Sequence, residues 1–436
     1  MKDQKPSRVI KLAHLLSALV FINLGLGLAA HAQTETVLVD FTGHSAGGTP
    51  FSNLRLDSAG NLYGTTYYGG VFSYGTVFKL THHPDGSWHE TLLHSFRGGK
   101  DSGNPWAGLT MDEKGNLYGT TTGGVLAGFG SVFKLTATPT GWQETVLHTF
   151  SGTRDGAAPY GPVILDAAGN IFGMTHNGGN TNNCNSGCGV VFELSPASGG
   201  TWKETILHTF SGGPDGAFPE DGLAMDKAGN LYGTASAGGT SLNCGGGCGV
   251  AFKLSPTKSG VWHETLLHDF SLGGDGGLPN SRFVLDSKGN LYSTTPLGGQ
   301  IGALYCGSAG CGVVYELSPQ ANGTWKETIL HSFTGTIDGD EPAEGGLTFD
   351  AAGNLYGSTA LGGDLNSCPG VGCGVVFKLS PNGDGTWNET ELYDFTGGSD
   401  GGGPFSAPIL DLKGNLNGTT DGGGTYQYGT VWQITP

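Results

Sequence analysis

The chain has 436 residues and a formal net charge of −17, with 37 acidic residues against 20 Lys and Arg. So acidic a chain disfavours a nucleic-acid partner, because phosphate backbones are bound mainly through Lys and Arg. Its 82 glycines would be typical of a fibrous or disordered chain. They stand, however, at fixed positions among aromatic and β-branched residues, which indicates turns between strands.

The first 32 residues have the pattern of a signal peptide. A basic head and an apolar stretch over 12–30 precede Ala30-His31-Ala32, which places small residues before a cleavage site. We predict residues 1–32 as a signal peptide cleaved after Ala32. The alternative is an uncleaved membrane anchor, which His14 and Asn23 weaken.

The rest of the chain carries a net charge near −20, because residues 1–32 hold four basic residues and one acid. It contains no second long apolar segment, and Pro436 follows no hydrophobic tail. We therefore expect an exported protein, periplasmic or extracellular, without a C-terminal anchor and without membrane insertion after cleavage.

A sevenfold repeat organises the remaining chain. The phrase Gly-Asn-Leu-Tyr-Gly-Thr-Thr, or a close variant, occurs seven times at intervals of 54 to 64 residues. A fixed period of this size is typical of repeat architectures. The asparagines of the seven copies are Asn61, Asn116, Asn170, Asn230, Asn290, Asn354 and Asn415.

Each repeat predicts four strands, which we name A to D in chain order. The second copy is representative: strand A over 107–112, a hairpin at Gly115, then strands B, C and D over 117–121, 130–136 and 142–150. Outside the first 32 residues, no segment holds a helical apolar period over ten residues. Seven such units predict an all-β fold, a seven-bladed β-propeller with four antiparallel strands per blade.

The two ends of the repeat region complement each other. Residues 35–41 match strand D, as in 90–96, whereas 429–436 match strand C and stop there. We predict that the N-terminal strand 35–41 completes blade 7 and closes the ring, which removes two open strand edges. Residues 33–436 would then form a single domain, which we expect to be a monomer.

The loops of such a disc differ between its two faces. The A–B turns barely change from copy to copy, whereas the B–C and D–A loops vary in length and content. A varied surface on a constant scaffold is where binding normally occurs. We therefore place the candidate binding surface on the face formed by the B–C and D–A loops.

All eight cysteines lie in pairs in B–C loops. Each pair brackets a short loop before strand C, so we predict local disulfides in an oxidising compartment, with zinc binding as the alternative. Units one, two and seven carry Tyr74, Phe129 and Tyr428 instead, which indicates a stapling role. The predicted disulfides are Cys184–Cys188, Cys244–Cys248, Cys306–Cys311 and Cys368–Cys373.

Acidic residues recur in the D–A loops as Asp-Gly-x-x-Pro. We interpret these aspartates as turn formers that accept local N–H bonds, since calcium needs six or more converging oxygens. One loop is more acidic than the others, and calcium is the one cofactor considered for it. Its candidate metal ligands are Asp338, Asp340, Glu341 and Glu344.

Two further groups of polar residues stand out. Histidines recur in strand D of five copies, where Val39 and Tyr393 replace them in the others, so we interpret them as packing residues. The second group occurs once each on the variable loops and forms our candidate ligand-binding set. Its members are Arg154, Tyr160, His176, Glu220, Asp221 and Arg282.

The repeated words Trp-x-Glu-Thr and Leu-His-x-Phe, together with Gly-Asn-Leu-Tyr-Gly-Thr-Thr, resemble the GloVer repeat. This repeat occurs in exported bacterial proteins called choice-of-anchor tandem repeat proteins, and the match covers essentially residues 35–436. The resemblance implies a β-propeller and brings no catalytic residues with it. Such proteins often end in a C-terminal sorting signal, which this chain lacks before Pro436.

Three functions remain open on the sequence alone. We favour a binding module for an extracellular glycan or protein on the B–C and D–A loop face. The alternatives are a glycoside hydrolase or lyase that uses two carboxylates, or a His/Tyr pair, near the axis, and a structural surface or matrix component. Strand A is apolar in nearly every copy, with Arg55 and Arg282 as the off-pattern charges, so no catalytic residue is assigned.

Overall fold

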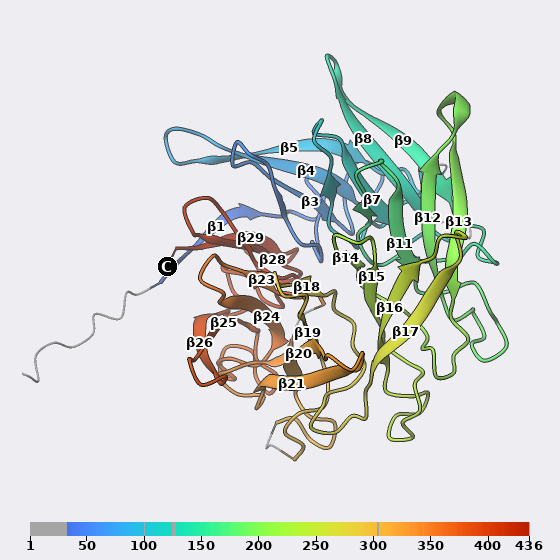
Figure 1. Cartoon of the computed structure of the whole chain (residues 1–436). Coiled ribbons are helices and arrows are strands. Elements are labelled where there is room, and N and C mark those ends of the chain that lie inside the picture. Colours follow the sequence, from blue (N-terminus) through green and yellow to red (C-terminus); the bar gives the residue numbers. More distant parts are fainter. Residues whose placement is uncertain (1–32, 100, 124–127, 303–304, 343, 436) are drawn as a thin grey trace, which may run out of the picture.

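The computed structural model describes residues 33–99, 101–123, 128–302, 305–342 and 344–435. They form a ring of seven blades, each a sheet of four antiparallel strands, so the predicted all-β propeller is confirmed (Figure 1). The one helical element among these residues is a short 3-10 turn, Ser198–Gly200. None of them belongs to a helix long and apolar enough to cross a membrane. The predicted signal peptide, 1–32, lies outside the described residues.

The first four blades follow the predicted order of strands A to D. Blade 1 contains β2 (Arg55–Leu56), β3 (Leu62–Thr66), β4 (Thr76–His82) and β5 (Trp88–Ser95). Blade 2 contains β6 (Thr110–Met111), β7 (Leu117–Thr121), β8 (Ser131–Thr138) and β9 (Gly141–Thr149). Blade 3 contains β10 (Ile164–Leu165), β11 (Ile171–Thr175), β12 (Val190–Pro196) and β13 (Trp202–Thr209). Blade 4 contains β14 (Ala224–Met225), β15 (Leu231–Ala235), β16 (Val250–Pro256) and β17 (Trp262–Asp269).

The last three blades keep this order, except that blade 6 has one extra strand and blade 7 takes its fourth strand from the start of the chain. Blade 5 contains β18 (Val284–Leu285), β19 (Leu291–Thr295), β20 (Val313–Pro319) and β21 (Trp325–Ser332). Blade 6 contains β23 (Thr348–Phe349), β24 (Leu355–Leu361), β25 (Val375–Pro381) and β26 (Trp387–Asp394), and β22 (Asp340–Pro342) also pairs with β24. Blade 7 contains β27 (Ile409–Leu410), β28 (Leu416–Thr420), β29 (Thr430–Thr435) and β1 (Thr34–Asp40).

The first and last strands of the chain lie side by side in one sheet. β1 pairs antiparallel with β29, with Thr34 opposite Thr435 and Asp40 opposite Thr430 (Figure 1). Phe41, which follows β1, donates its backbone N–H to the Gly429 carbonyl at 3.1 Å. The N-terminal strand therefore occupies the strand D position of blade 7.

The repeated Gly-Asn phrase builds the A–B turn. In blade 1, Gly60 adopts φ +85°, a left-handed conformation that favours glycine. Asp57 accepts hydrogen bonds from the backbone N–H groups of Ala59 and Asn61, and from the Asn61 side chain at 2.7 Å. The same Asp–Asn side-chain bond recurs in all seven blades. The phrase is thus a turn-forming element of the scaffold.

The core lies at the contacts between consecutive blades, which we call seams. At each of the seven seams an aromatic residue that ends strand D packs against an aromatic residue of the next blade's strand C, with ring centroids 5.1–5.6 Å apart. A glycine in strand B makes room for the ring: a Cβ at Gly64 would lie 2.5 Å from Phe78. Most of these aromatic side chains are fully buried. The seams therefore hold the blades together mainly by apolar packing.

All four predicted disulfides are present, and no described cysteine is free, so zinc binding by these pairs is excluded. Their presence indicates an oxidising compartment and an exported protein. The Cys368–Cys373 pair packs against Gly397 of the next D–A loop, and Tyr74 packs in the same way against Gly98. The tyrosine thus takes the place of a disulfide beside that loop, as the sequence predicted.

Replacing Cys368 and Cys373 together by alanine is expected to lower the free energy of unfolding by about 2 kcal/mol, since the closed loop is short. Chemical denaturation of the two proteins measures this difference. Val371→Ala in the same loop, where the side chain is 54% exposed, is the matched control and should change little. An unchanged denaturation midpoint in the double variant would show that the disulfide does not stabilise the folded protein.

Candidate functional site

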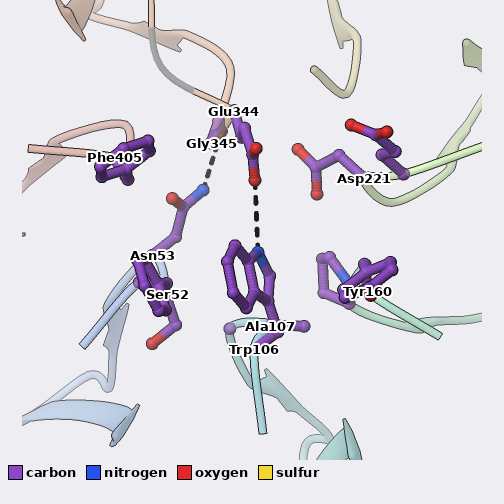
Figure 2. A pocket seen from close by; sticks show the side chains of 13 residues that line it. Ser52, Asn53, Trp106, Ala107, Tyr160, Asp221, Glu344, Gly345 and Phe405 are labelled. Carbon is purple, nitrogen blue, oxygen red and sulfur yellow. Dashed lines mark hydrogen bonds between the residues drawn. The ribbon is translucent and has the colours of Figure 1, made fainter. Parts of the chain in front are cut away.

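In five D–A loops the residue directly after a proline lines a common cavity. In blade 6 this place is taken by Glu344, because its loop is one residue longer. Side chains from six of the seven blades line one cavity, which must therefore lie on the ring axis (Figure 2). We call the following residues the axial cluster: Phe51, Trp106, Tyr160, Glu220, Asp221, Glu344 and Phe405.

Four aromatic rings form one side of the axial cluster. The rings of Phe51 and Trp106 stack at 4.0 Å with an interplanar angle of 15°. Phe405 lies edge-on to Phe51 at 5.8 Å, and Tyr160 lies edge-on to Trp106 at 5.7 Å. Tyr67, from the end of β3, packs edge-on against both Phe51 and Trp106. Blades 7, 1, 2 and 3 thus present a continuous aromatic arc.

Three carboxylates form the other side. The Trp106 indole N–H reaches across the axis and donates to Glu344 Oε2 at 3.2 Å (Figure 2). Burial raises the pKa of Glu344 to about 7, and the nearby negative charges of Glu220 and Asp221 add to this, whereas the Trp106 hydrogen bond opposes it. Burial likewise raises the pKa of Asp221. At neutral pH a substantial fraction of Glu344 is therefore protonated.

Backbone contacts fix the loops that carry these side chains. Asp221 accepts hydrogen bonds from the N–H groups of Gly222 at 2.6 Å and Arg282 at 3.0 Å. Asn53 donates to the Gly345 carbonyl at 2.8 Å and accepts from the Ala407 N–H at 3.0 Å, which links blades 1, 6 and 7. The free volume of the cavity is about 30 Å³, room for about two water molecules. The cavity can therefore hold water but no sugar-sized ligand.

Comparison with known proteins supports the repeat assignment. The model of the Gloeobacter/Verrucomicrobia repeat matches residues 27–246, 83–305 and 240–436. The chain belongs to this repeat family. A search of curated proteins found no match. Among solved structures, a putative oxidoreductase (glucose dehydrogenase) from Thermus thermophilus aligns at 12% identity with a TM-score of 0.44, over 92% of this chain and 100% of that one.

Within this repeat protein, the candidate ligand-binding set is only partly brought together. Tyr160, Glu220 and Asp221 line the axial cavity. His176 lies beside them, with Nε2 at 3.4 Å from Glu220 Oε1 and its ring 5.3 Å from that of Tyr160. Two members lie elsewhere. Arg282 lines a separate cavity with Arg55 between the inner strands, and Arg154 is exposed on its loop and lines neither cavity.

The four candidate calcium ligands do not form one group among the described residues. Asp338 accepts from the Thr334 N–H at 3.0 Å and faces His331, as expected of a turn aspartate. Glu344 points to the axis and binds Trp106. Asp340 lies beside the Cys306–Cys311 disulfide, and Glu341 is exposed. These acids therefore have separate partners and do not converge as a cation site would require.

Several residues of the axial cluster were missed by sequence reasoning. Phe51, Trp106 and Phe405 are apolar side chains in loops, and Glu344 was assigned to calcium. The signal that finds them is the residue after the proline of each D–A loop, which is aromatic in four copies and Glu or Asn in two, while Glu344 stands one position later in its longer loop. Aligning the seven copies on this proline would have revealed an axial position that differs from blade to blade.

Proposed function

We propose that this exported propeller binds an extracellular glycan at its axial cluster, on the face formed by the B–C and D–A loops. The observation that carries the proposal is the juxtaposition of an aromatic arc and three carboxylates in a cavity lined by six of the seven blades. These residues differ between blades, whereas the turns and seams repeat. A site of this kind is expected where function resides on a constant scaffold.

Sugars match both halves of the cluster. The C–H face of a pyranose ring is apolar and packs against aromatic rings, and its hydroxyl groups donate hydrogen bonds to carboxylates. Three acids on a propeller whose residues 33–436 carry a net charge near −20 repel anionic ligands. The proposal therefore favours neutral or amino sugars over acidic polysaccharides. A free volume of about 30 Å³ is too small for a sugar ring, so the sugar would lie over the cluster and not inside the cavity.

The test is a glycan array probed with the exported chain, residues 33–436, with and without calcium, followed by titration of the best ligand. Glu220→Gln is expected to weaken binding 10- to 100-fold, because a hydrogen bond to a charged group contributes about 1.5–3 kcal/mol. Glu113→Gln, exposed on the opposite A–B turn face, is the matched control. Failure of every neutral glycan to bind at millimolar concentration would overturn the proposal.

One observation also favours a second candidate, a glycoside hydrolase. Glu344, with its pKa raised to about 7, lies near Glu220 and Asp221. A protonated carboxyl group next to an ionised one is the pair that glycosidic bond cleavage uses. The same array ligands distinguish the two functions: release of a reducing end, lost in Glu344→Gln, supports catalysis, whereas binding without turnover supports the binding module.

A further inference from the structure

Three consecutive seams each bring a histidine, an aspartate and a glutamate together. The histidine comes from strand D, the aspartate from the D–A loop that follows it, and the glutamate from strand D of the next blade. In each trio the candidate ligand atoms lie within 4.8 Å of one another. The seam trios are His94, Asp101 and Glu144; His148, Asp155 and Glu204; and His208, Asp215 and Glu264.

The histidines of the seam trios have an unused nitrogen. Nε2 of His94, His148 and His208 is buried and has no hydrogen-bond partner. One carboxylate oxygen of each glutamate is likewise buried without a hydrogen-bond partner: Oε1 of Glu144, Glu204 and Glu264. Buried polar atoms are normally satisfied, because an unpaired one costs about 1–3 kcal/mol. The glutamate oxygen is also unpaired at Glu35 and Glu90, in seams without a histidine, so what distinguishes the seam trios is the buried histidine nitrogen that faces two carboxylates.

The spacing of these atoms identifies what kind of partner fits. His148 Nε2 lies 3.7 Å from Asp155 Oδ2 and 3.4 Å from Glu204 Oε1. The corresponding distances in the other two trios are 3.6–3.8 Å, and in the first trio the glutamate oxygen nearest to His94 is Oε2 of Glu144. These exceed ordinary hydrogen-bond lengths. Ligand atoms about 2.0–2.2 Å from a tetrahedral ion lie about 3.3–3.6 Å apart, so a small ion between them would satisfy all three with little movement.

We propose that each seam trio binds a divalent transition-metal ion of the zinc class. One imidazole and two carboxylates suit such an ion, whereas calcium takes six or more oxygens and avoids imidazole. Arg97 lies beside the first trio and offsets part of its negative charge. The ion pairs described for the other two trios involve no Lys or Arg, so a dication would balance their two carboxylates. His94, Asp101 and Glu144 also line a solvent-open cavity, which provides a route of entry.

The remaining seams supply built-in comparisons. The seam after blade 4 has the same composition, with His268 Nε2 at 3.4 Å from Asp275 and 3.5 Å from Glu327. The seam after blade 5 has it too, with His331 Nε2 at 3.3 Å from Asp338 and Glu389 at the glutamate position. The seam between blades 6 and 7 has Tyr393 bonded to Asp400 in place of the histidine. The seam between blades 7 and 1 has Val39 at the histidine position. The proposal therefore predicts three to five metal ions per chain, not seven.

The experiment uses the exported chain, residues 33–436, stripped with EDTA and titrated with Zn²⁺ by calorimetry. Co²⁺ serves as a second probe, because its visible absorption is intense only in tetrahedral sites. We expect three to five equivalents of Zn²⁺ and a tetrahedral Co²⁺ spectrum. The variant His148→Gln with His208→Gln should lose two equivalents, while Tyr393→Phe, at a seam without the histidine, should lose none.

Circular dichroism of the stripped variants shows whether each retains its sheets. If the double variant does not fold, Glu204→Gln replaces it and should lose one equivalent. Absence of Zn²⁺ and Co²⁺ binding at 1 mM metal would overturn the proposal. An unchanged number of bound ions in the folded variants would do the same, because the ions would then occupy other sites.

Discussion

Replacing Phe41 with alanine is expected to lower the free energy of unfolding by about 3–5 kcal/mol. Phe41 is fully buried at the seam between blades 7 and 1, and its ring packs edge-on against Phe78 at 5.3 Å. It also follows β1, the strand that pairs with β29. The substitution therefore removes apolar packing between the first and last parts of the chain. Chemical denaturation of the exported chain measures the loss.

Two variants make this measurement specific. Phe150→Ala removes the equivalent ring from an interior seam, where Phe150 lies 5.2 Å from Phe192. Leu412→Ala changes a side chain that is 83% exposed and should have little effect. Equal losses for Phe41 and Phe150 would show that the N-terminal strand is held as firmly as an interior one. A much smaller loss for Phe41 would contradict the expectation.

Glu90→Gln is expected to stabilise the protein in a pH-dependent manner. One carboxylate oxygen of Glu90 is buried without a hydrogen-bond partner, and burial raises the pKa of this residue to about 7. By repeat position, Val39 and Ala46 stand where other seams have His and Asp. Glu90 is thus a buried acid without the polar partners of its counterparts, and its ionised form is unfavourable in the folded state.

The sign follows from proton linkage. Below the unfolded pKa of 4.5, the carboxyl group is protonated in both states and imposes no penalty. Between pH 4.5 and about 7 only the unfolded state releases the proton, so the free energy of unfolding falls as pH rises. Gln is neutral throughout. Glu90→Gln should therefore gain roughly 3 kcal/mol over the wild type at pH 8 and almost nothing at pH 4.

Denaturant midpoints at pH 4, 6 and 8 measure this effect, with Glu113→Gln on the exposed A–B turn as the control. A gain that is independent of pH would mean that Gln packs better, not that a buried charge was removed. A loss of stability at pH 8 would show that the ionised Glu90 is satisfied in the folded protein.

Most of the fold was predictable because its signals are local. Turn glycines, strand lengths and the repeat period lie within one unit, so strands B to D of blade 2 start and end within two residues of their predicted bounds. Strand A was predicted over 107–112, but β6 comprises only Thr110–Met111. The preceding residues, such as Ala107 and Gly108, instead line the axial cavity.

The site was less predictable because it exists only once the ring forms. Tyr160, Glu220 and Asp221 were selected as unusual residues of their loops, and they do meet at the axis. Trp106 and Glu344 are 238 residues apart, and no local pattern links them. The seam trios were not predicted for the same reason. Each glutamate belongs to the blade after the one that supplies its histidine, so no pattern within one repeat links the two residues.

The position of the axial residues has a consequence for how this repeat family can diversify. Six blades contribute side chains from their D–A loops, and the aromatic seams and the Asp–Asn turns lie elsewhere in the repeat. A substitution at one of these loop positions changes the surface of the axial cluster without repacking a blade. Evolution could therefore alter the axial cluster one blade at a time while the scaffold stays the same.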